Sequence, residues 1–386
     1  SFQLFFSTDS PWCLLMSSSI FSALTSQNTF QSIQNKWKIM NMDIKKDFST
    51  SIHHWQLRHL LKPALDLVPQ QERELSVLYV QDRTIYLATI KDDPPPPKAI
   101  VSVDFSPYCF TYRNGFLAAA GNSGSLSVFR VPPSNIEQSD LIWTGRVARS
   151  AVNAVEICER KGCIFLLVSS NDGEVKSYHI PSMLLRFQGT FSASINHAML
   201  NQAGDMLIAV GDCKEVFVQT LQEDKLEEYA VFSEAEDYSY SCSWHSDDRT
   251  FAAGSQDGMV NVWDLRTASS TFRTGQSLAH FNSHQTNTSS KPIRSVQFSQ
   301  SSSVDLLVFA EQVSFVSIVD TRNYEDRQLL YVNTKRRRIG NAGETDIAGI
   351  SFSPSCHTMF ISTPESILKF NTDVTSRRSF GCFSFH

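Results

Sequence analysis

The sequence lacks the residue patterns that mark the common enzyme classes. It contains no Gly-x-Ser-x-Gly elbow, no His-Glu-x-x-His motif and no glycine-rich phosphate loop followed by lysine. His280 and His284 lie in a stretch rich in Ser and Thr, whereas a metal pair at that spacing needs a helix. These absences predict a protein that is not an enzyme and that holds no metal and no cofactor.

Paired cysteines, long apolar runs and a strong net charge are also missing. The eight cysteines include no Cys-x-x-Cys pair, which favours buried thiols over disulfides or zinc and predicts an intracellular protein of the cytoplasm, the nucleus or both. No run of about eighteen apolar residues occurs, so we expect no membrane-spanning segment. The net charge of -5 does not favour binding to nucleic acid.

One stretch, residues 251–266, carries the pattern that organises the chain. It reads FAAGSQDGMVNVWDLR and contains two apolar runs that flank the turn residues Asp257 and Gly258. Alternating apolar residues in the second run predict a strand with one buried face, and an Asp-Gly turn is typical of a tight hairpin. Trp263 and Asp264 end the second strand.

Similar units recur along the chain, which predicts an all-β fold built from repeats. A second Asp-Gly turn, at Asp172, lies at the same place in its unit, and both aspartates are interpreted as structural repeat markers together with Trp263 and Asp264. The seven units lie near residues 75–90, 99–131, 152–180, 194–221, 238–265, 293–321 and 347–372. The positions equivalent to Trp263 are Ala88, Phe129, Tyr178, Gln219, Val319 and Phe370.

This pattern resembles the WD-repeat family, in which a repeat spans roughly 40–45 residues and ends in Trp-Asp. The resemblance implies one seven-bladed β-propeller, which we place at residues 46–386. The closing segment, residues 344–381, and the HWQLR stretch near Trp55 resemble a mainly fungal, uncharacterised WD-repeat group with a C-terminal domain of unknown function. That resemblance implies a fold and no activity.

Several long connections in this repeat are expected to be loops. They span residues 134–143, 268–291 and 324–344 and are rich in polar residues. The stretch from Ile52 to Leu61 is expected to form a short helix or a packed strand, and Trp55 to pack between blades. We expect the ring to be closed by the region from Trp55 to Leu78 meeting the last blade and the segment from Arg377 to Phe385.

The N-terminal segment, residues 1–45, is expected to lie outside the propeller. Its apolar residues are interrupted by serines and no basic residue precedes them, so a secretory signal fits poorly. We interpret it as a disordered tail or a leader that is not part of the functional protein. Met40 and Met42 are alternative starting points.

Two sets of basic residues are candidate contacts for partner proteins. Arg266 completes a Trp-Asp-x-Arg motif, and Arg322 repeats the Asp-x-Arg part. This motif is similar to that of substrate receptors of cullin-4-type ubiquitin ligases, in which the arginine reaches the adaptor; the alternative is an exposed charge of little consequence. The second set is the run Lys335, Arg336, Arg337 and Arg338, which is a nuclear import signal, a contact for an anionic partner or a solvated loop.

The sequence therefore predicts a scaffold or adaptor that binds other proteins, whose identity it leaves open. The alternative is a substrate receptor of a cullin-4-type ubiquitin ligase that binds the ligase adaptor.

Overall fold

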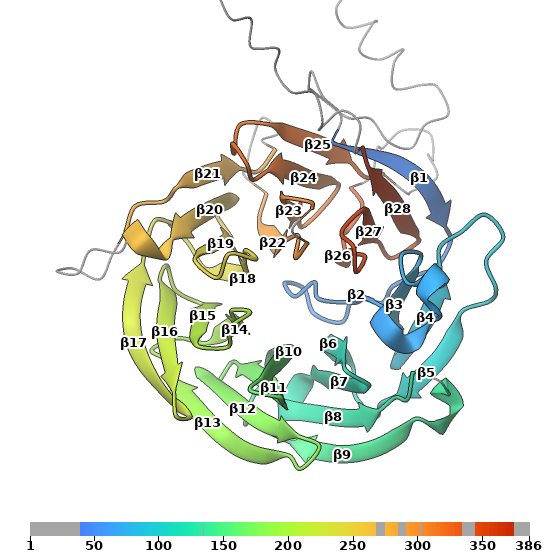
Figure 1. Cartoon of the computed structure of the whole chain (residues 1–386), viewed down its shortest axis with the longest axis horizontal. Helices are drawn as coiled ribbons and strands as arrows, with labels where there is room; N and C mark the ends of the chain where they lie inside the picture. Colours follow the sequence, from blue (N-terminus) through green and yellow to red (C-terminus); the bar gives the residue numbers. More distant parts are fainter. Residues whose placement is uncertain are drawn as a thin grey trace, which may run out of the picture.

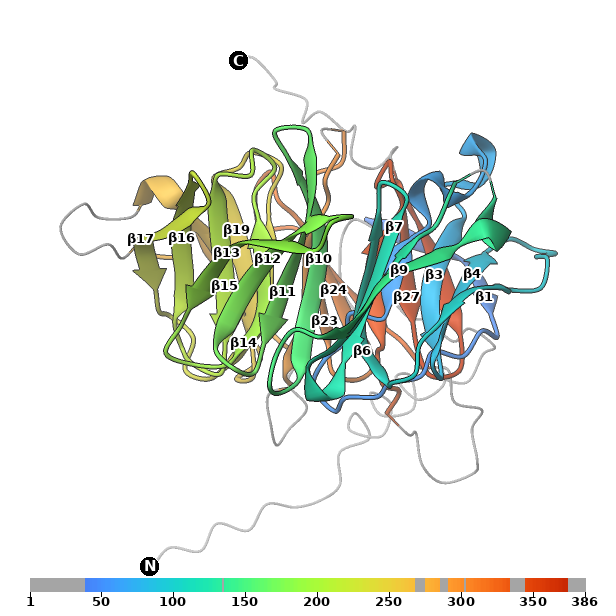
Figure 2. The ribbon, with the colours of Figure 1, turned by 90° about the horizontal axis from the view of Figure 1, so that it is seen from below.

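The computed structural model describes residues 39–133, 135–267, 275–284, 291–301, 303–333 and 344–373. These residues form seven four-stranded antiparallel sheets, which are arranged as blades around a central axis (Figure 1). Seen from the side, the blades form a disc with loops on two faces (Figure 2). The predicted all-β seven-bladed propeller is confirmed. The tail predicted at the N-terminus falls largely on residues 1–38, outside the described residues.

Each blade runs from an inner strand near the axis to an outer strand at the rim. Blade 1 comprises β2 (Leu61–Pro63), β3 (Ser76–Gln81), β4 (Thr84–Thr89) and β5 (Lys98–Ser102). Blade 2 comprises β6 (Pro107–Arg113), β7 (Phe116–Gly121), β8 (Ser125–Arg130) and β9 (Asp140–Arg146). Blade 3 comprises β10 (Val152–Arg160), β11 (Cys163–Ser170), β12 (Glu174–Ile180) and β13 (Leu184–Thr190). Blade 4 comprises β14 (Ile195–Leu200), β15 (Met206–Gly211), β16 (Val216–Gln222) and β17 (Lys225–Phe232). Blade 5 comprises β18 (Ser239–Trp244), β19 (Thr250–Ser255), β20 (Met259–Asp264) and β21 (Ala279–Asn282).

Blades 6 and 7 complete the ring. Blade 6 comprises β22 (Ile293–Phe298), β23 (Leu306–Glu311), β24 (Phe315–Asp320) and β25 (Arg327–Tyr331). Blade 7 comprises β26 (Gly349–Phe352), β27 (Thr358–Ser362), β28 (Ile367–Thr372) and β1 (Met40–Lys46). Single 3-10 turns are η1 (Leu65–Leu67), η2 (Gln70–Glu72), η3 (Asn122–Gly124), η4 (Ile136–Gln138) and η5 (Leu265–Thr267). In the described part of the chain, these turns are the longest helical elements, and none is long enough to cross a membrane.

Blade 5 illustrates how the repeat sequence forms its strands. Phe251 in β19 pairs with Trp263 in β20, and both side chains are buried. Gly258 in the intervening turn has a φ of 85°, a conformation that a residue without a Cβ adopts at little cost. The other six positions predicted to match Trp263 all lie in the third strand of their blades, so the repeat register was predicted correctly.

Seven apolar clusters hold the blades together, one between each pair of neighbouring blades. The cluster between blades 4 and 5, for example, joins Val218 of β16 to Trp244 of β18. The cluster that closes the circle packs Leu61 and Val77 of blade 1 against Phe360 of blade 7. Because every sheet presents an apolar face to each neighbour, stacking around the ring buries both faces. The other clusters follow the same scheme.

The ring is closed by β1, which pairs antiparallel with β28 and supplies the outer strand of blade 7 (Figure 1). Gln328 of β25 fixes the start of this strand: its Oε1 accepts the N–H groups of Ile39 and Met40 at 2.8 and 2.7 Å, and its Nε2 donates to the Met40 carbonyl at 2.9 Å. The predicted contact of residues 55–78 with the last blade is confirmed, but the outer strand of that blade is β1, which the prediction had placed in the N-terminal tail. The segment from Arg377 to Phe385 lies outside the described residues.

The predicted blade boundaries require two further corrections. The connections predicted as loops contain the outer strands β9, β21 and β25, whose mixed polar sequences hide their strand character because their far edge faces solvent. The unit predicted at residues 99–131 begins with β5, which belongs to the preceding blade, and the first strand of its own blade is β6. The domain boundary at residue 46 likewise moves to include β1.

The inner strands all run in the same direction, so the two faces of the disc differ. One face carries the connections that lead into each inner strand and the turns between second and third strands. It also carries residues 49–60, which we call the strap, and we call this the strap face. The opposite face carries the turns between first and second strands and those between third and fourth strands, including η5.

We expect Gln328→Ala to weaken ring closure. The substitution leaves the buried N–H groups of Ile39 and Met40 without their acceptor, which costs on the order of 1–3 kcal/mol of unfolding free energy. Urea denaturation followed by circular dichroism measures the change. Gln188→Ala on β13, where the exposed side chain donates to Glu174, is the matched control and is expected to change little. Equal stability of the two variants would contradict the role of Gln328.

Candidate functional site

The strap crosses the mouth of the central channel from one side of the ring to the other. His53 contacts the Asp82 carbonyl of blade 1 at 2.6 Å, and Gln56 donates to the Tyr240 hydroxyl of blade 5 at 2.7 Å. The strap then returns to the axis, where Leu60 N–H bonds the Ala348 carbonyl at 3.4 Å, and continues into β2. It contains neither the predicted helix nor the predicted strand, because its backbone bonds go to surrounding blades.

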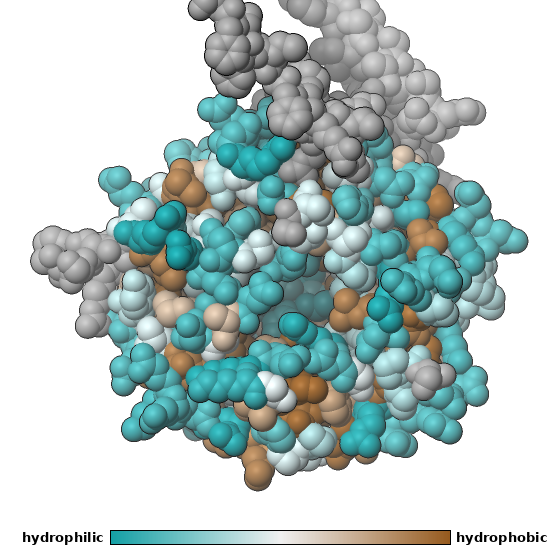
Figure 3. Space-filling view, viewed as in Figure 1, coloured by the Kyte–Doolittle hydropathy of each residue, from teal (hydrophilic) through white to brown (hydrophobic). Residues whose placement is uncertain are grey.

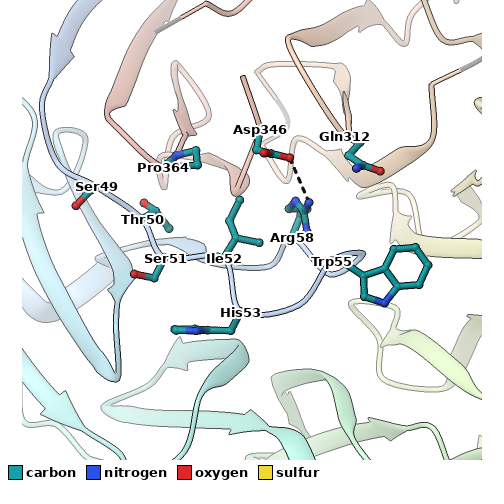
Figure 4. A pocket seen from close by; sticks show the side chains of 10 residues that line it. All are labelled: Ser49, Thr50, Ser51, Ile52, His53, Trp55, Arg58, Gln312, Asp346 and Pro364. Atoms are coloured by element: carbon teal, nitrogen blue, oxygen red, sulfur yellow. Dashed lines mark ion pairs between the residues drawn. The ribbon is translucent and has the colours of Figure 1, made fainter. Parts of the chain in front are cut away.

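Beside the strap lies a hollow of about 660 Å³, which we call the strap hollow. Figure 4 shows its wall, to which the strap contributes Arg58 and Trp55 and the blades contribute Gln312, Asp346 and Pro364. The Arg58 guanidinium points toward the Asp346 carboxylate, at 3.5 Å. Seen from the other side of the ring, the centre is hollowed and hydrophilic side chains lie in its depth (Figure 3).

Arg294, at the start of β22, lies beneath the strap. Its side chain is 2% exposed, and its guanidinium lies 4.2 Å from the centre of the Tyr240 ring and 6.0 Å from that of Trp55. Nε and Nη2 donate to Gln312 Oε1 at 3.2 and 2.8 Å, whereas the buried Nη1 has no hydrogen-bond acceptor. Burial lowers the pKa of Arg294, and interaction with Tyr240 raises it. A charged group is thus held in the protein by an amide and aromatic rings.

Trp55 is the most exposed aromatic residue of the site, at 68%. The expectation that it packs between blades was wrong, because the strap carries it over the channel mouth rather than into a blade interface. Trp244 is buried between blades, as expected of an apolar anchor.

Glu311, next to Gln312 in sequence, is a second buried charge-bearing group at the strap face. It is 1% exposed, and its Oε1 accepts the His284 N–H at 2.6 Å, while Oε2 has no partner. Burial raises the pKa of Glu311 to about 8, against the lowering effect of that hydrogen bond and of the Arg327 and Lys291 charges. Near neutral pH this carboxyl group is therefore largely protonated.

The interior of the channel holds a separate ionic cluster. Lys62 of β2 lies 2.8 Å from Glu156 Oε1 of β10, and His197 Nε2 lies 3.5 Å from the same oxygen. The His59 and His197 rings are 4.6 Å apart, and burial lowers the pKa of His59. This cluster links three blades, and its carboxylate is already matched by a lysine.

The described residues offer no metal site, and two of their thiols are buried and unreactive. Within the described ranges, no three His, Cys, Asp or Glu side chains converge closely enough to hold a metal ion. Burial raises the pKa of the Cys109 and Cys242 thiols well above the usual range, so both remain protonated and unreactive near neutral pH. The six described cysteines are free.

The predicted repeat markers Asp172 and Asp257 lie in turns on the strap face. Asp172 accepts the N–H groups of Arg149 and Ser150 at 2.6 and 3.0 Å, and Asp257 accepts that of Glu236 at 2.8 Å. Burial raises the pKa of Asp172, but these hydrogen bonds outweigh it and the net pKa is lowered. Each aspartate thus ties a turn to the loop that leads into the same blade.

The predicted partner contacts Arg266 and Arg322 lie on the opposite face, at the ends of β20 and β24. Each guanidinium folds back on the carboxylate two residues earlier: Arg266 Nε bonds Asp264 Oδ1 at 3.0 Å, and Arg322 Nε bonds Asp320 Oδ1 at 2.9 Å. The arginine side chains nevertheless remain 70% and 50% exposed.

Two predicted features of the site remain to be placed. Trp263 is a buried repeat marker that stacks on Phe251 with ring centroids 5.4 Å apart. The basic run at residues 335–338 falls outside the described residues.

Sequence reasoning missed Arg58, Arg294, Gln312 and Asp346. They come from four separate stretches of the chain, and none belongs to a spaced motif. A signal was present at Arg294, since a charged residue opens an inner strand in the apolar–polar pattern IRSVQF, but its neighbours in space could not be read from that pattern.

Comparison with known proteins agrees with this geometry. Residues 227–264, which contain most of the outer strand of blade 4 and the first three strands of blade 5, match the family described as WD domain, G-beta repeat. The chain is a seven-bladed β-propeller, and this part of it matches the WD-repeat family. Residues 292–331 match an uncharacterised protein domain, DUF2415. This match lies on blade 6 and not on the closing segment at residues 344–381.

A relative is similar to this chain over most of its length. The chain is 27% identical over 346 residues to an uncharacterised protein of Schizosaccharomyces pombe, C4G3.03, and the match covers 85% of this chain and 90% of that protein. The fungal, uncharacterised character of the predicted resemblance is confirmed by this match. The match indicates no biochemical activity.

We expect Glu311→Gln to change the pH dependence of stability. Because the pKa of Glu311 is raised to about 8 in the folded protein from an ordinary value near 4.5, the wild type loses stability as pH rises between these values. The amide keeps the acceptor for His284 N–H and cannot ionise. The variant should be more stable at pH 9 by about 1 kcal/mol or more, and nearly unchanged at pH 4.5.

Urea denaturation at several pH values measures this difference. Glu365→Gln, at an exposed carboxylate on the same face, is the matched control and should follow the wild type throughout. A parallel pH profile for Glu311→Gln and the wild type would show that Glu311 does not titrate as its burial requires.

Proposed function

We propose that this WD-repeat propeller is a non-enzymatic scaffold or adaptor that binds other proteins at the strap face. WD-repeat propellers generally bind proteins, and one scaffold serves many roles, so the site must carry the argument. The observation that carries it is Trp55, which the strap holds 68% exposed beside a hollow of about 660 Å³. Tryptophan is enriched among residues that dominate binding energy at protein interfaces.

The position of Trp55 supports docking rather than local packing. The strap is fixed by bonds to blades 1 and 5 on either side, so the indole is presented from an anchored backbone. An anchored residue loses less conformational entropy on binding than one on a free loop. The six described cysteines are free, which supports our proposal that the protein acts inside the cell, in the cytoplasm, the nucleus or both.

We expect Trp55→Ala to abolish partner binding. The full-length tagged protein is purified from cells of its own source, and co-purifying proteins are identified by mass spectrometry. Leu184→Ala is the matched control, since Leu184 is 65% exposed on an outer strand of blade 3. Partners should be retained by the wild type and by Leu184→Ala, and reduced about ten-fold or more by Trp55→Ala. The same partners at the same yield with Trp55→Ala would overturn docking at the strap face.

A second candidate is the substrate receptor of a cullin-4-type ubiquitin ligase. The observation that favours it is the repetition of one arrangement, an exposed arginine braced by an aspartate, at the ends of β20 and β24 in neighbouring blades. We propose that two such groups on one face contact an adaptor. Arg266 and Arg322 are the residues proposed to make that contact.

Replacement of both arginines tests this candidate. The double variant Arg266→Ala, Arg322→Ala should lose the ligase adaptor from the purified complex, because the exposed charges that face it are removed. Arg186→Ala is the control, since Arg186 is similarly exposed and is braced by Asp224. If the adaptor is missing from the wild-type purification, the ligase function is refuted.

A further inference from the structure

Arg294 carries a positive charge that no described carboxylate neutralises. The groups that act on it most strongly are its own burial and Tyr240, and its hydrogen bonds go to the amide oxygen of Gln312. A guanidinium has five N–H donors, and the buried Nη1 has no acceptor. Burying a charge without a counter-ion is costly, so a natural occupant of this region is an anion.

Arg58 is a second buried guanidinium in the same place. It is 3% exposed, and burial lowers its pKa to about 10, with a further lowering by Arg294. Its Nε has no hydrogen-bond partner, and its nearest carboxylate, Asp346, lies at 3.5 Å with its side chain 45% exposed. Of these two neighbouring cations, only Arg58 has a carboxylate partner among the described residues, and that carboxylate is half-exposed.

The strap hollow gives an oxyanion access to these donors. Arg58 and Gln312 both line the hollow, and Gln312 also accepts the Arg294 hydrogen bonds. An anion that replaces the Gln312 oxygen would meet Arg294 from the hollow and Arg58 from the strap. Trp55, which lies over Arg294, would cover the far side of such a ligand.

We propose that the strap hollow binds an acidic side chain of a partner protein, a carboxylate or a phosphate monoester, through Arg58 and Arg294. This inference rests on the proposed docking at the strap face and specifies its chemistry. Planar guanidinium groups match both oxyanions with paired, charge-assisted hydrogen bonds.

The surroundings favour a single acid on a polypeptide over a polyanion. Asp212 and Asp237 act on Tyr240 and Asp346 borders the hollow, so a string of phosphates would meet repulsion on either side of the two arginines. The exposed indole of Trp55 offers apolar contact to residues that flank the acid. Charge and apolar surface side by side fit a peptide segment.

Fluorescence polarisation with the full-length protein tests the proposal. The probes are fluorescein-labelled peptides of one Ser-Gly-Leu sequence that carry at the centre glutamate, phosphoserine or glutamine. We expect the glutamate or phosphoserine peptide to bind at least about ten-fold more tightly than the glutamine peptide, and to weaken as salt is raised. Equal binding of all three would overturn the proposal, and the preferred acid distinguishes carboxylate from phosphate.

Two kinds of variant assign the binding to the hollow. Arg294→Gln and Arg58→Gln should weaken the acidic peptide about ten-fold or more, whereas Arg266→Gln, with the same charge change on the opposite face, should not. Because a buried arginine variant can fail to fold, Asp346→Asn provides a gain of function: it removes the competing carboxylate and should tighten binding several-fold. Asp93→Asn, at an exposed residue on the opposite face, is its control.

Other results of these experiments would refute the acidic site in the strap hollow. An equal loss with Arg266→Gln, or no gain with Asp346→Asn, would assign the binding to overall charge and refute the site. Inorganic phosphate that competes at the affinity of the phosphoserine peptide would identify a free anion as the ligand instead. If partners depend on Trp55 while no acidic peptide binds, docking at the strap face stands and the acidic specificity is wrong.

Discussion

The structure depends on the fact that each four-stranded sheet has two apolar faces and can bury only one against a single neighbour. A row of such sheets would leave an apolar face open at each end, and bending the row into a ring removes both ends. Seven apolar clusters, one at each blade junction, show that the ring satisfies this constraint all the way around. Pairing of β1 with β28 joins the two ends of the described chain, so blade 7 depends on both.

This closure also explains why a strap crosses the channel mouth. The chain leaves β1 at the outer rim of blade 7 and must next form β2, the innermost strand of blade 1. The connection therefore has to travel radially across one face of the disc toward the axis. Here it extends beyond the axis to Tyr240 of blade 5 before it returns, and this excursion places Trp55 and Arg58 over the channel.

The sequence predicted the repeat more fully than it predicted the site. Trp263 and its six equivalents lie in third strands because the tight turn and the apolar alternation are local properties that recur. Outer strands such as β25 were missed because one of their edges faces solvent, where the apolar alternation is weaker. The strand β1 was missed because its partner lies at the other end of the chain. Arg294 and Arg58 are brought together by ring closure, which no local pattern records.

The two buried arginines could be explained without a ligand, if their role were to anchor the strap through Trp55 and Tyr240. That explanation accounts for the ring contacts of Arg294 at 4.2 and 6.0 Å, but it leaves Arg294 Nη1 and Arg58 Nε without acceptors. An apolar side chain would anchor the strap without the cost of burying a charge. A buried hydrogen-bond network with unsatisfied donors is less stable than an apolar contact in its place. Unused donors beside an open hollow are accounted for when an acid from another protein completes the network.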